Sequence, residues 1–293
     1  MSEYVSCNLC GADDAVLVTD KTRFNNSYRF VKCRKCGLVY MNPRPTQKEL
    51  TKWYEVNRDC TTNLSTEEYE SQFAKRDEER ALATCRLNVD GKRILDIGCA
   101  TGVFLSLMRE AGWQVTGIEP HLRYADVARK KGISIVSKRV EDADLPPASY
   151  DVISMFSTLE HLADPAGCIN RVSQWLRSGG AAIIEVPTLD VMRLRLDREY
   201  IKGQCDNWHL YMFSHKTLKA LFNRSHLQIV HRRAMTANVV IPVAISASVG
   251  RRNSLVMRLL KIVLFRPAYY TLRVIATKVF CIGDLIRVIA IKK

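Results

Sequence analysis

Two carboxylates and two glycines near the middle of the 293-residue chain have the types and spacing of a nucleoside-binding site. Asp96 ends a short apolar run, Gly98 and Gly102 follow it, and Glu119 ends the next apolar run. Glycines let the backbone approach a ligand closely, because no Cβ intervenes. A carboxylate about twenty residues further along can accept hydrogen bonds from ribose hydroxyls. The spacing therefore predicts a strand, a glycine-rich turn, a helix and a second strand that together hold a nucleoside.

The turn reads Asp-Ile-Gly-Cys-Ala-Thr-Gly and lacks the second glycine of the dinucleotide fingerprint G-x-G-x-x-G. It resembles the first motif of the class I S-adenosylmethionine-dependent methyltransferases; a strand–helix turn without a ligand is the alternative. The resemblance implies a Rossmann-like α/β fold with a seven-stranded sheet and S-adenosylmethionine as cofactor. It implies these cofactor-binding residues in this part of the chain: Asp96, Gly98, Cys99, Gly102 and Glu119.

Later segments extend this resemblance over residues 90–230. In these methyltransferases an acidic residue after the third strand accepts a hydrogen bond from the adenine amino group, and Glu141 or Asp142 has that place. Residues 150–156 are predicted as the fourth strand, and Phe156 at its end is a further candidate cofactor-binding residue. The Leu-Glu-His-Leu run that starts at Leu159 resembles the segment that follows the fourth strand in this superfamily.

Methyl transfer to a hydroxyl or to an acidic carbon needs a group that takes a proton. His161 follows the fourth strand at the sheet edge where ligands collect in open α/β folds, and histidine suits this role near neutral pH. His209 and Tyr211 lie in an aromatic segment that folds back over the active site in the resembling proteins. Two residues apart in an extended segment, they are expected to point the same way. All three are candidate catalytic residues, and packing roles are the alternative.

Two Cys-x-x-Cys pairs near the start of the chain indicate a metal site. A tetrahedral zinc ion bound by four thiolates fits such pairs, and about 45 residues cannot bury enough core without one. All four coordination positions are filled by protein, which predicts a structural ion; a redox-active pair is the minor alternative. The predicted ligands are Cys7, Cys10, Cys33 and Cys36.

The elements that position these residues divide the chain into five parts. A zinc ribbon is predicted over residues 1–45, and linker helices over residues 46–92. The S-adenosylmethionine-binding core is predicted over residues 93–234. An apolar and basic helical insert, residues 235–282, then precedes the last core strand, residues 283–293.

The composition, with 47% hydrophobic and 25% charged residues, is that of a folded globular protein. The first residues lack the basic and apolar regions of a secretory signal, and no run of about 18 apolar residues predicts a spanning helix. We therefore expect a cytoplasmic protein in which the ten cysteines stay reduced.

The net charge of +14 is concentrated at one end of the chain. Residues 201–293 contain sixteen lysines and arginines against two acids, and residues 251–281 contain seven against none. Basic residues at helical spacing among apolar ones predict an amphipathic surface that binds an anionic membrane, which would place the enzyme on the inner face of the membrane. Each basic residue would contribute about 1 kcal/mol. A helical cover for the sheet, or a homodimer interface, is the alternative.

The whole chain resembles class I methyltransferases that begin with a zinc ribbon, among them sugar C-methyltransferases and tailoring enzymes of glycan and natural-product pathways. This implies methyl transfer to an oxygen or carbon of a small molecule, a sugar or a lipid-linked glycan. The Leu-Glu-His segment also resembles the quinone O-methyltransferases, whose substrates have lipid tails. Sugar C-methyltransferases carry a further C-terminal domain that this sequence lacks, which weakens the case for a nucleotide-sugar substrate.

Two other functions compete with this interpretation. An RNA methyltransferase could bind phosphates through the ribbon and the basic end of the chain. The sequence contains neither an Asn/Asp-Pro-Pro-Tyr motif after the fourth strand nor a Pro-Cys pair, so nucleic acid is the less favoured partner. A non-catalytic scaffold that binds membranes or other proteins is the second competitor, and the intact glycine-rich motif argues against it.

Overall fold

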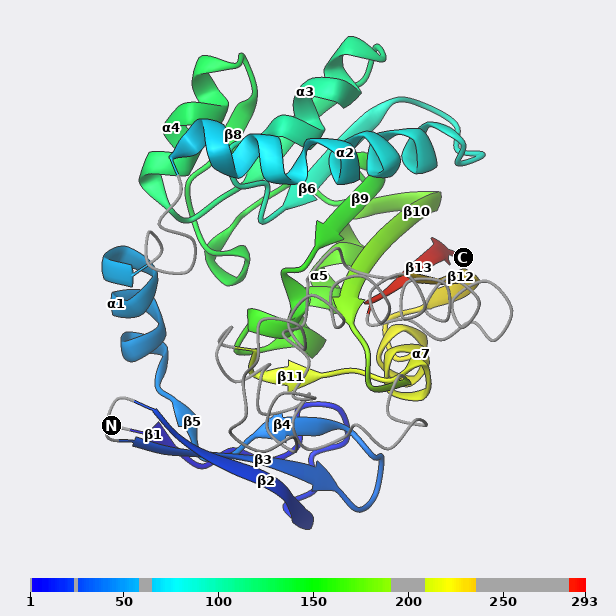
Figure 1. Cartoon of the computed structure of the whole chain (residues 1–293). Helices are drawn as coiled ribbons and strands as arrows, with labels where there is room; N and C mark the ends of the chain where they lie inside the picture. The colour runs from blue at the N-terminus through cyan, green and yellow to red at the C-terminus, as the bar shows by residue number, and fades with distance from the viewer. Residues whose placement is uncertain (1, 24–25, 58–64, 191–208, 236–284) are drawn as a thin grey trace, which may run out of the picture.

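The computed structural model describes residues 2–23, 26–57, 65–190, 209–235 and 285–293 (Figure 1). The predicted basic insert falls almost entirely outside these residues, as do Asn207 and Trp208 of the aromatic segment. None of the helices in the described ranges has the length and apolar character needed to span a bilayer.

A seven-stranded sheet forms the centre of the molecule, in the order β12-β13-β10-β9-β6-β7-β8. The five strands from β10 to β8 pair in parallel, whereas β13 pairs antiparallel with both β10 and β12. The prediction of a Rossmann-like sheet of seven strands is thereby confirmed. The strands are β6 (Arg93–Ile97), β7 (Gln114–Ile118), β8 (Ser134–Val136), β9 (Tyr150–Phe156), β10 (Leu176–Pro187), β12 (Leu227–Met235) and β13 (Leu285–Lys292).

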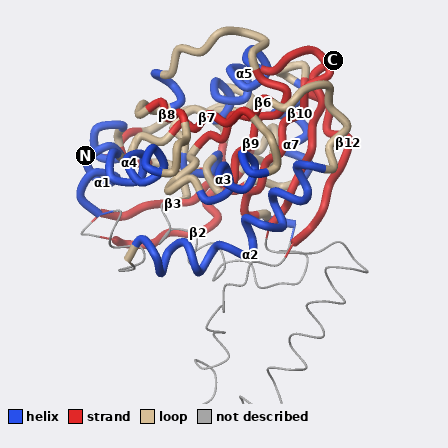
Figure 2. Tube along the Cα trace, turned by 90° about the horizontal axis from the view of Figure 1, so that it is seen from above, coloured by secondary structure: helices blue, strands red, loops and turns tan. Residues whose placement is uncertain are grey.

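Helices cover both faces of this sheet, because neighbouring residues of the buried strands point to opposite sides. Ile94 belongs to the apolar cluster under α2, α3 and α4, and Leu95 belongs to the cluster under α5 and α7. Figure 1 shows α2, α3 and α4 together on one side, and Figure 2 shows α2 running along the outside of the fold. The helices are α2 (Thr66–Cys85), α3 (Val103–Glu110), α4 (Leu122–Lys130), α5 (Pro165–Trp175) and α7 (His215–Asn223).

The described residues between 2 and 45, called the ribbon below, form a small β-rich unit that packs against the α5 and α7 side of the fold. Its hairpin, β2 (Ala15–Arg23) and β3 (Asn26–Cys33), continues into β4 (Val39–Met41). The short strand β11 (Tyr211–Met212), which follows far along the chain, completes this second sheet in the order β11-β4-β3-β2. Ribbon and core therefore share one apolar interior.

Short elements lie at the edge of the ribbon and between it and the core. The two-residue strand β1 (Ser2–Glu3) pairs antiparallel with β5 (Arg44–Pro45), and α1 (Gln47–Asn57) leads towards α2. A capping box begins α2: the Ser65 hydroxyl accepts from the N–H of Glu68, and the Glu68 side chain accepts from the N–H of Ser65. The sequence pattern Ser-Thr-Glu-Glu therefore marks a real helix start.

A buried ion network joins the last strand to α2. Arg80 donates from Nε and Nη2 to one carboxylate oxygen of Glu185, at 3.0 and 2.9 Å, and Arg287 donates to the other at 2.6 Å. Arg80 also donates to Asp77 at 2.7 Å and lies over the Phe156 ring. Burial alone would raise the pKa of Glu185, but the two guanidinium groups outweigh it and hold this pKa below its usual value.

Replacing Glu185 by leucine should destabilise the protein by about 3–5 kcal/mol, because the substitution leaves two buried guanidinium groups without their shared carboxylate. Asp126→Ala is the matched control: it breaks the exposed pair with Arg129 and should cost less than about 1 kcal/mol. Urea unfolding of both variants measures the difference. Equal losses of stability would show that the buried network stabilises the fold no more than an exposed ion pair does.

Candidate functional site

A cavity of about 1070 Å³ opens where the parallel strands β6, β7 and β9 end. It is bounded by the turns after these strands and by residues of α1 and α2. Ligands in open α/β sheets bind at this edge. Eight of the eleven predicted catalytic and cofactor-binding residues line it: Asp96, Gly98, Cys99, Glu119, Glu141, Phe156, His161 and His209.

The two glycines of the turn have different roles. Gly98 has a φ of +78°, and a Cβ placed on it would lie 2.4 Å from the Thr158 hydroxyl oxygen. Gly102 has a φ of +77°, but its Cβ would meet Ile133 at 2.5 Å, inside the protein and away from the cavity lining. Gly98 therefore lets the turn approach Thr158, which also lines the cavity, whereas Gly102 lets α3 pack closely against its neighbours.

Glu119 holds the turn in place from the end of β7. Its side chain is fully buried, and its two oxygens accept from the backbone N–H groups of Ala100 and His121, each at 2.9 Å. A carboxylate offers about four acceptor positions, so these two bonds do not exhaust it. Glu119 can therefore order the turn and also accept hydrogen bonds from ribose hydroxyls.

Asp96 is buried at the end of β6 and accepts a hydrogen bond from Ser154 at 2.7 Å. Burial raises the pKa of Asp96 to about 8. A cation placed in the cavity beside this group would favour its charged form. The ammonium group of a bound S-adenosylmethionine is a cation of this kind.

The two acids expected to contact adenine differ in position. Glu141 lines the cavity, whereas Asp142 lies outside the lining and forms an ion pair with Arg139 at 2.8 Å. Of the two predicted acids, Glu141 is thus the better placed. Tyr69 and Tyr124 line the same cavity, and their rings stack with 5.7 Å between centroids.

Three ionisable side chains meet at the end of the cavity formed by the turn after β9. The rings of His161 and His209 are 4.7 Å apart, and His209 Nε2 lies 3.9 Å from a carboxylate oxygen of Glu160. Glu160 is fully buried, and neither of its carboxylate oxygens has a hydrogen-bond partner among the described residues. The three side chains offer ligand atoms within 4.8 Å of one another, so they could act as an acid–base group or bind a cation.

The environment sets the charge of this group. Burial, with a contribution from His161, lowers the pKa of His209 well below 6.5, so its imidazole is neutral at pH 7. Burial raises the pKa of Glu160 to about 8. Sequence analysis missed Glu160, because one acid in the Leu-Glu-His-Leu run gives no sign that it will be buried.

Tyr211 does not share this position, contrary to the expectation that it would point the same way as His209. The strand β11 begins only at Tyr211, which is buried in the ribbon sheet and lies outside the cavity lining. Its hydroxyl donates to the carbonyl of Ala163 and accepts from Arg44, both at 3.1 Å. Burial raises the pKa of Tyr211 to about 12, which does not suit a base.

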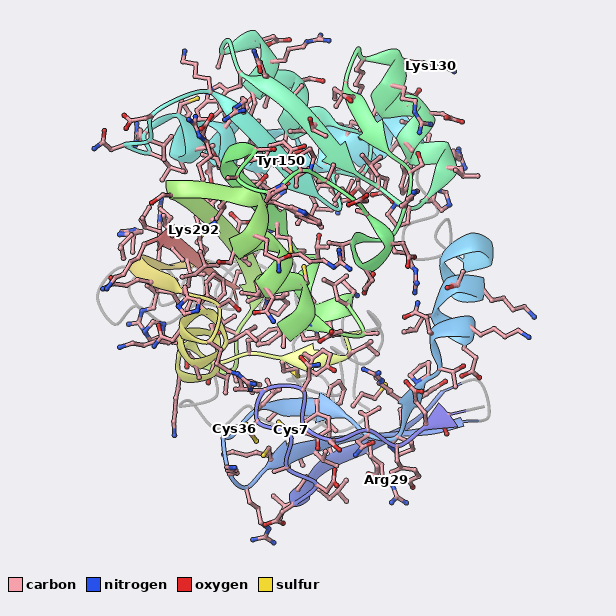
Figure 3. The ribbon with its side chains drawn as sticks, turned by 180° about the vertical axis from the view of Figure 1, so that it is seen from behind. Cys7, Arg29, Cys36, Lys130, Tyr150 and Lys292 are labelled. Atoms are coloured by element: carbon pink, nitrogen blue, oxygen red, sulfur yellow. The ribbon has the colours of Figure 1, made fainter. Side chains whose placement is uncertain are left out.

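The four predicted zinc ligands converge at the ribbon, where Figure 3 shows Cys7 and Cys36 side by side. Sγ of Cys7 lies 3.5 Å from that of Cys36, and Sγ of Cys10 lies 3.5 Å from that of Cys33. These separations are too long for disulfides and close to the roughly 3.8 Å between sulfurs around a tetrahedral zinc ion with bonds of about 2.3 Å. The four thiols, called the ribbon cluster below, therefore fit a structural zinc ion.

The sheet order, the glycine-rich turn and the buried glutamate after the second core strand together define the fold of the class I S-adenosylmethionine-dependent methyltransferases. Comparison of the sequence with known families matches residues 67–232 to the methyltransferase-domain family. This match covers more than half of the chain, and the chain belongs to that family. It is thus a class I S-adenosylmethionine-dependent methyltransferase with an N-terminal cysteine cluster.

Known proteins with related sequences and structures agree with this assignment. The ubiquinone biosynthesis O-methyltransferase of Aeromonas salmonicida is 36% identical over 101 residues, and that of Leptothrix cholodnii is 33% identical over 100 residues. These matches cover 32% and 31% of this chain and only 42% and 43% of the relatives.

Solved structures show the same fold at low sequence identity. A chain of the complex between the Haloferax volcanii Trm112 methyltransferase activator and a methyltransferase aligns with a TM-score of 0.55 and 15% identity, covering 84% of this chain and 99% of that one. A methyltransferase from Mesorhizobium loti aligns with a TM-score of 0.52 and 19% identity, covering 74% and 98%.

Gly98→Ala should weaken the binding of S-adenosylhomocysteine at least tenfold, because the new methyl group meets Thr158 and the positive φ becomes strained. Gly179→Ala is the control: its φ is +75°, but no atom lies within 4 Å of the added Cβ. Isothermal titration calorimetry should find its affinity within twofold of wild type. Similar affinities for all three proteins would mean that the turn at Gly98 does not hold the cofactor.

Proposed function

We propose that this protein transfers the methyl group of S-adenosylmethionine to an oxygen of a small-molecule or lipid-linked acceptor, with His209 as the proton acceptor. The observation that carries the proposal is the shared cavity: the glycine-rich turn follows β6, His161 follows the adjacent strand β9, and His209 lines the same cavity. The names of the O-methyltransferase relatives support oxygen as the acceptor atom. An acidic carbon of a sugar is the remaining alternative.

The chain contributes mainly by positioning. When bound, S-adenosylmethionine supplies an electrophilic methyl group on a sulfonium. Glu119 and Glu141 would fix its nucleoside, and Asp96 would hold its ammonium group. An acceptor oxygen held in line, about 3 Å from the methyl carbon, needs little further chemistry from the protein.

His209 fits the role of base better than the other two candidates. Its lowered pKa keeps the imidazole neutral at physiological pH, so it is ready to take a proton from the acceptor. Glu160 lies 3.9 Å from His209 Nε2, and an imidazolium formed there would favour the charged form of this carboxyl and be stabilised by it. His161 packs edge-on against His209 and is the second candidate for the same role.

A divalent cation is the second candidate for activating the acceptor. A buried carboxylate without hydrogen-bond partners is costly, and a cation bound by Glu160, His161 and His209 would remove that cost. Two imidazoles and one carboxylate form a common donor set for divalent metals. Such an ion would lower the pKa of a bound acceptor hydroxyl.

The proposed contact with a membrane rests on the amino-acid sequence alone. The seven basic residues within 251–281 would hold the enzyme at an anionic surface, where lipid-linked acceptors are found. The homodimer and RNA alternatives for this segment concern residues outside the described ranges and stay predictions.

His209→Gln should lower the rate of methyl transfer about 10²–10³-fold, because it removes the proton acceptor. The assay follows transfer of tritiated methyl groups from S-adenosylmethionine to a panel of phenols, catechols and lipid-linked sugars. In the wild type the rate should not fall as the pH is lowered from 7 to 6.5, since the pKa of His209 lies well below 6.5. His215→Gln, which lies outside the cavity lining, should keep full activity.

Two outcomes would contradict the role of His209. One is a His209→Gln enzyme as fast as wild type. The other is activity of the zinc-loaded protein that depends strictly on added Mn²⁺. A cation would then activate the acceptor in place of His209.

A further inference from the structure

The segment that carries His209 continues into the ribbon sheet, not into the methyltransferase sheet. Strand β11 pairs antiparallel with β4, with Tyr211 opposite Tyr40 and Met212 opposite Val39. Figure 1 shows β11 beside β4, although the two lie far apart in the sequence. The candidate base therefore stands at the start of a ribbon strand.

The peptide that follows His209 is held from two sides. The N–H of Leu210 donates to the carbonyl of Glu160 at 2.8 Å, and the Leu210 carbonyl accepts from the N–H of Met41 at 2.8 Å. Glu160 belongs to the turn after β9, and Met41 belongs to β4. The segment that follows His209 is thus held between the turn after β9 and the ribbon.

Arg44, which follows the ribbon sheet, strengthens the same connection. Its Nη1 atom donates to the carbonyl of Ala163 at 2.6 Å and to the hydroxyl of Tyr211 at 3.1 Å. Ala163 lines the cavity two residues after His161. The Arg44 guanidinium therefore links the loop after His161 to strand β11, which follows His209.

The first cysteine knuckle makes direct contact with the same loop. Asn8, next to Cys7, donates to the Asp164 carboxylate at 2.8 Å and accepts from the N–H of Ala166 at 2.9 Å. The neighbouring Leu9 carbonyl accepts from Arg224 at the end of α7. The first knuckle thus caps α5, which begins directly after the turn that follows β9.

The shape of this knuckle depends on its cysteines. The N–H groups of Cys10 and Gly11 donate to the Cys7 carbonyl at 3.2 and 2.7 Å, which wraps the backbone around the sulfur atoms. In small cysteine-bound domains the free energy of metal binding is the free energy of folding. Loss of the ion would therefore release Asn8 and Leu9, and with them the loop they hold.

The cofactor half of the cavity is built differently. Its turn is held by hydrogen bonds from Gly98 to Ile118 and from Ala100 and His121 to Glu119. All of these partners lie within 24 residues of one another, on β6, β7 and the turns that follow them. None of these contacts involves the ribbon.

We infer that the ribbon cluster controls the acceptor half of the active site: its metal ion holds His209 and residues 160–166 in their working positions, while the cofactor half stands without it. The inference rests on the proposed function only for the catalytic role of His209. The positions themselves follow from the contacts above.

Hydrogen exchange of the full-length protein tests the inference without an acceptor. Zinc-loaded protein is compared with protein stripped by a strong chelator, and binding of S-adenosylhomocysteine is measured on both. Stripping should raise exchange at least tenfold in residues 209–213 and 160–166. Exchange in residues 94–119 should change less than twofold, and the affinity for S-adenosylhomocysteine should stay within threefold.

Two results would overturn the inference: unchanged exchange at residues 209–213 after stripping, or an equal rise in all parts of the protein. The second would make the ion a general stabiliser. Failure of S-adenosylhomocysteine to bind even the zinc-loaded protein would instead count against the proposed function.

Arg44→Met separates positioning from metal loss, because it leaves the ribbon cluster intact. The variant should retain the zinc content of wild type. In histidine-labelled protein it should lose the ring-to-ring nuclear Overhauser effect between His161 and His209, and Arg44→Lys should restore it. Arg34→Met is the matched control, since Arg34 is exposed within the second knuckle and pairs with Asp14. A full Overhauser effect in Arg44→Met would contradict the inference.

Discussion

The buried carboxylate of Glu119 is the constraint on which the site depends. A buried carboxyl group must be matched by hydrogen bonds, and here the backbone N–H groups of Ala100 and His121 provide them. These two groups belong to the turns after β6 and β7. One side chain therefore fixes both turns at the edge of the sheet, where the proposed function places the ribose.

The cavity joins two halves of different origin. The cofactor half forms within one stretch of chain, from β6 to the acid Glu141 after β8, and this stretch carries the family's motifs. The acceptor half combines the turn after β9 with His209 and the ribbon, which are distant in sequence. Under the proposed function, the turn at Gly98 is therefore held by contacts that do not involve the acceptor half.

Sequence reasoning succeeded where the chemistry is local. Gly98 and Glu119 could be placed from spacing alone, because one strand, one turn and one helix fix their positions. The ribbon cluster was equally accessible, since a Cys-x-x-Cys pair contains its own turn. The seven-stranded sheet was expected from the resemblance of the glycine-rich motif and the segments after it, and the structure confirms it.

The failures lie where contacts are long-range. A strand of two residues has no periodicity, so nothing in the sequence assigned β11 to the ribbon sheet or separated Tyr211 from His209. Glu160 was missed for a related reason: its burial is caused by packing against a segment some fifty residues later. The charge network of Arg80, Glu185 and Arg287 likewise joins a helix and two strands that only the folded chain brings together.

The most direct measurement of the central claim is a crystal structure of the protein with S-adenosylhomocysteine. The account predicts both ribose hydroxyls on the Glu119 carboxylate, the adenine beside Glu141 and the sulfur facing His209. A nucleoside bound elsewhere, or a turn at Gly98 closed against it, would contradict the account.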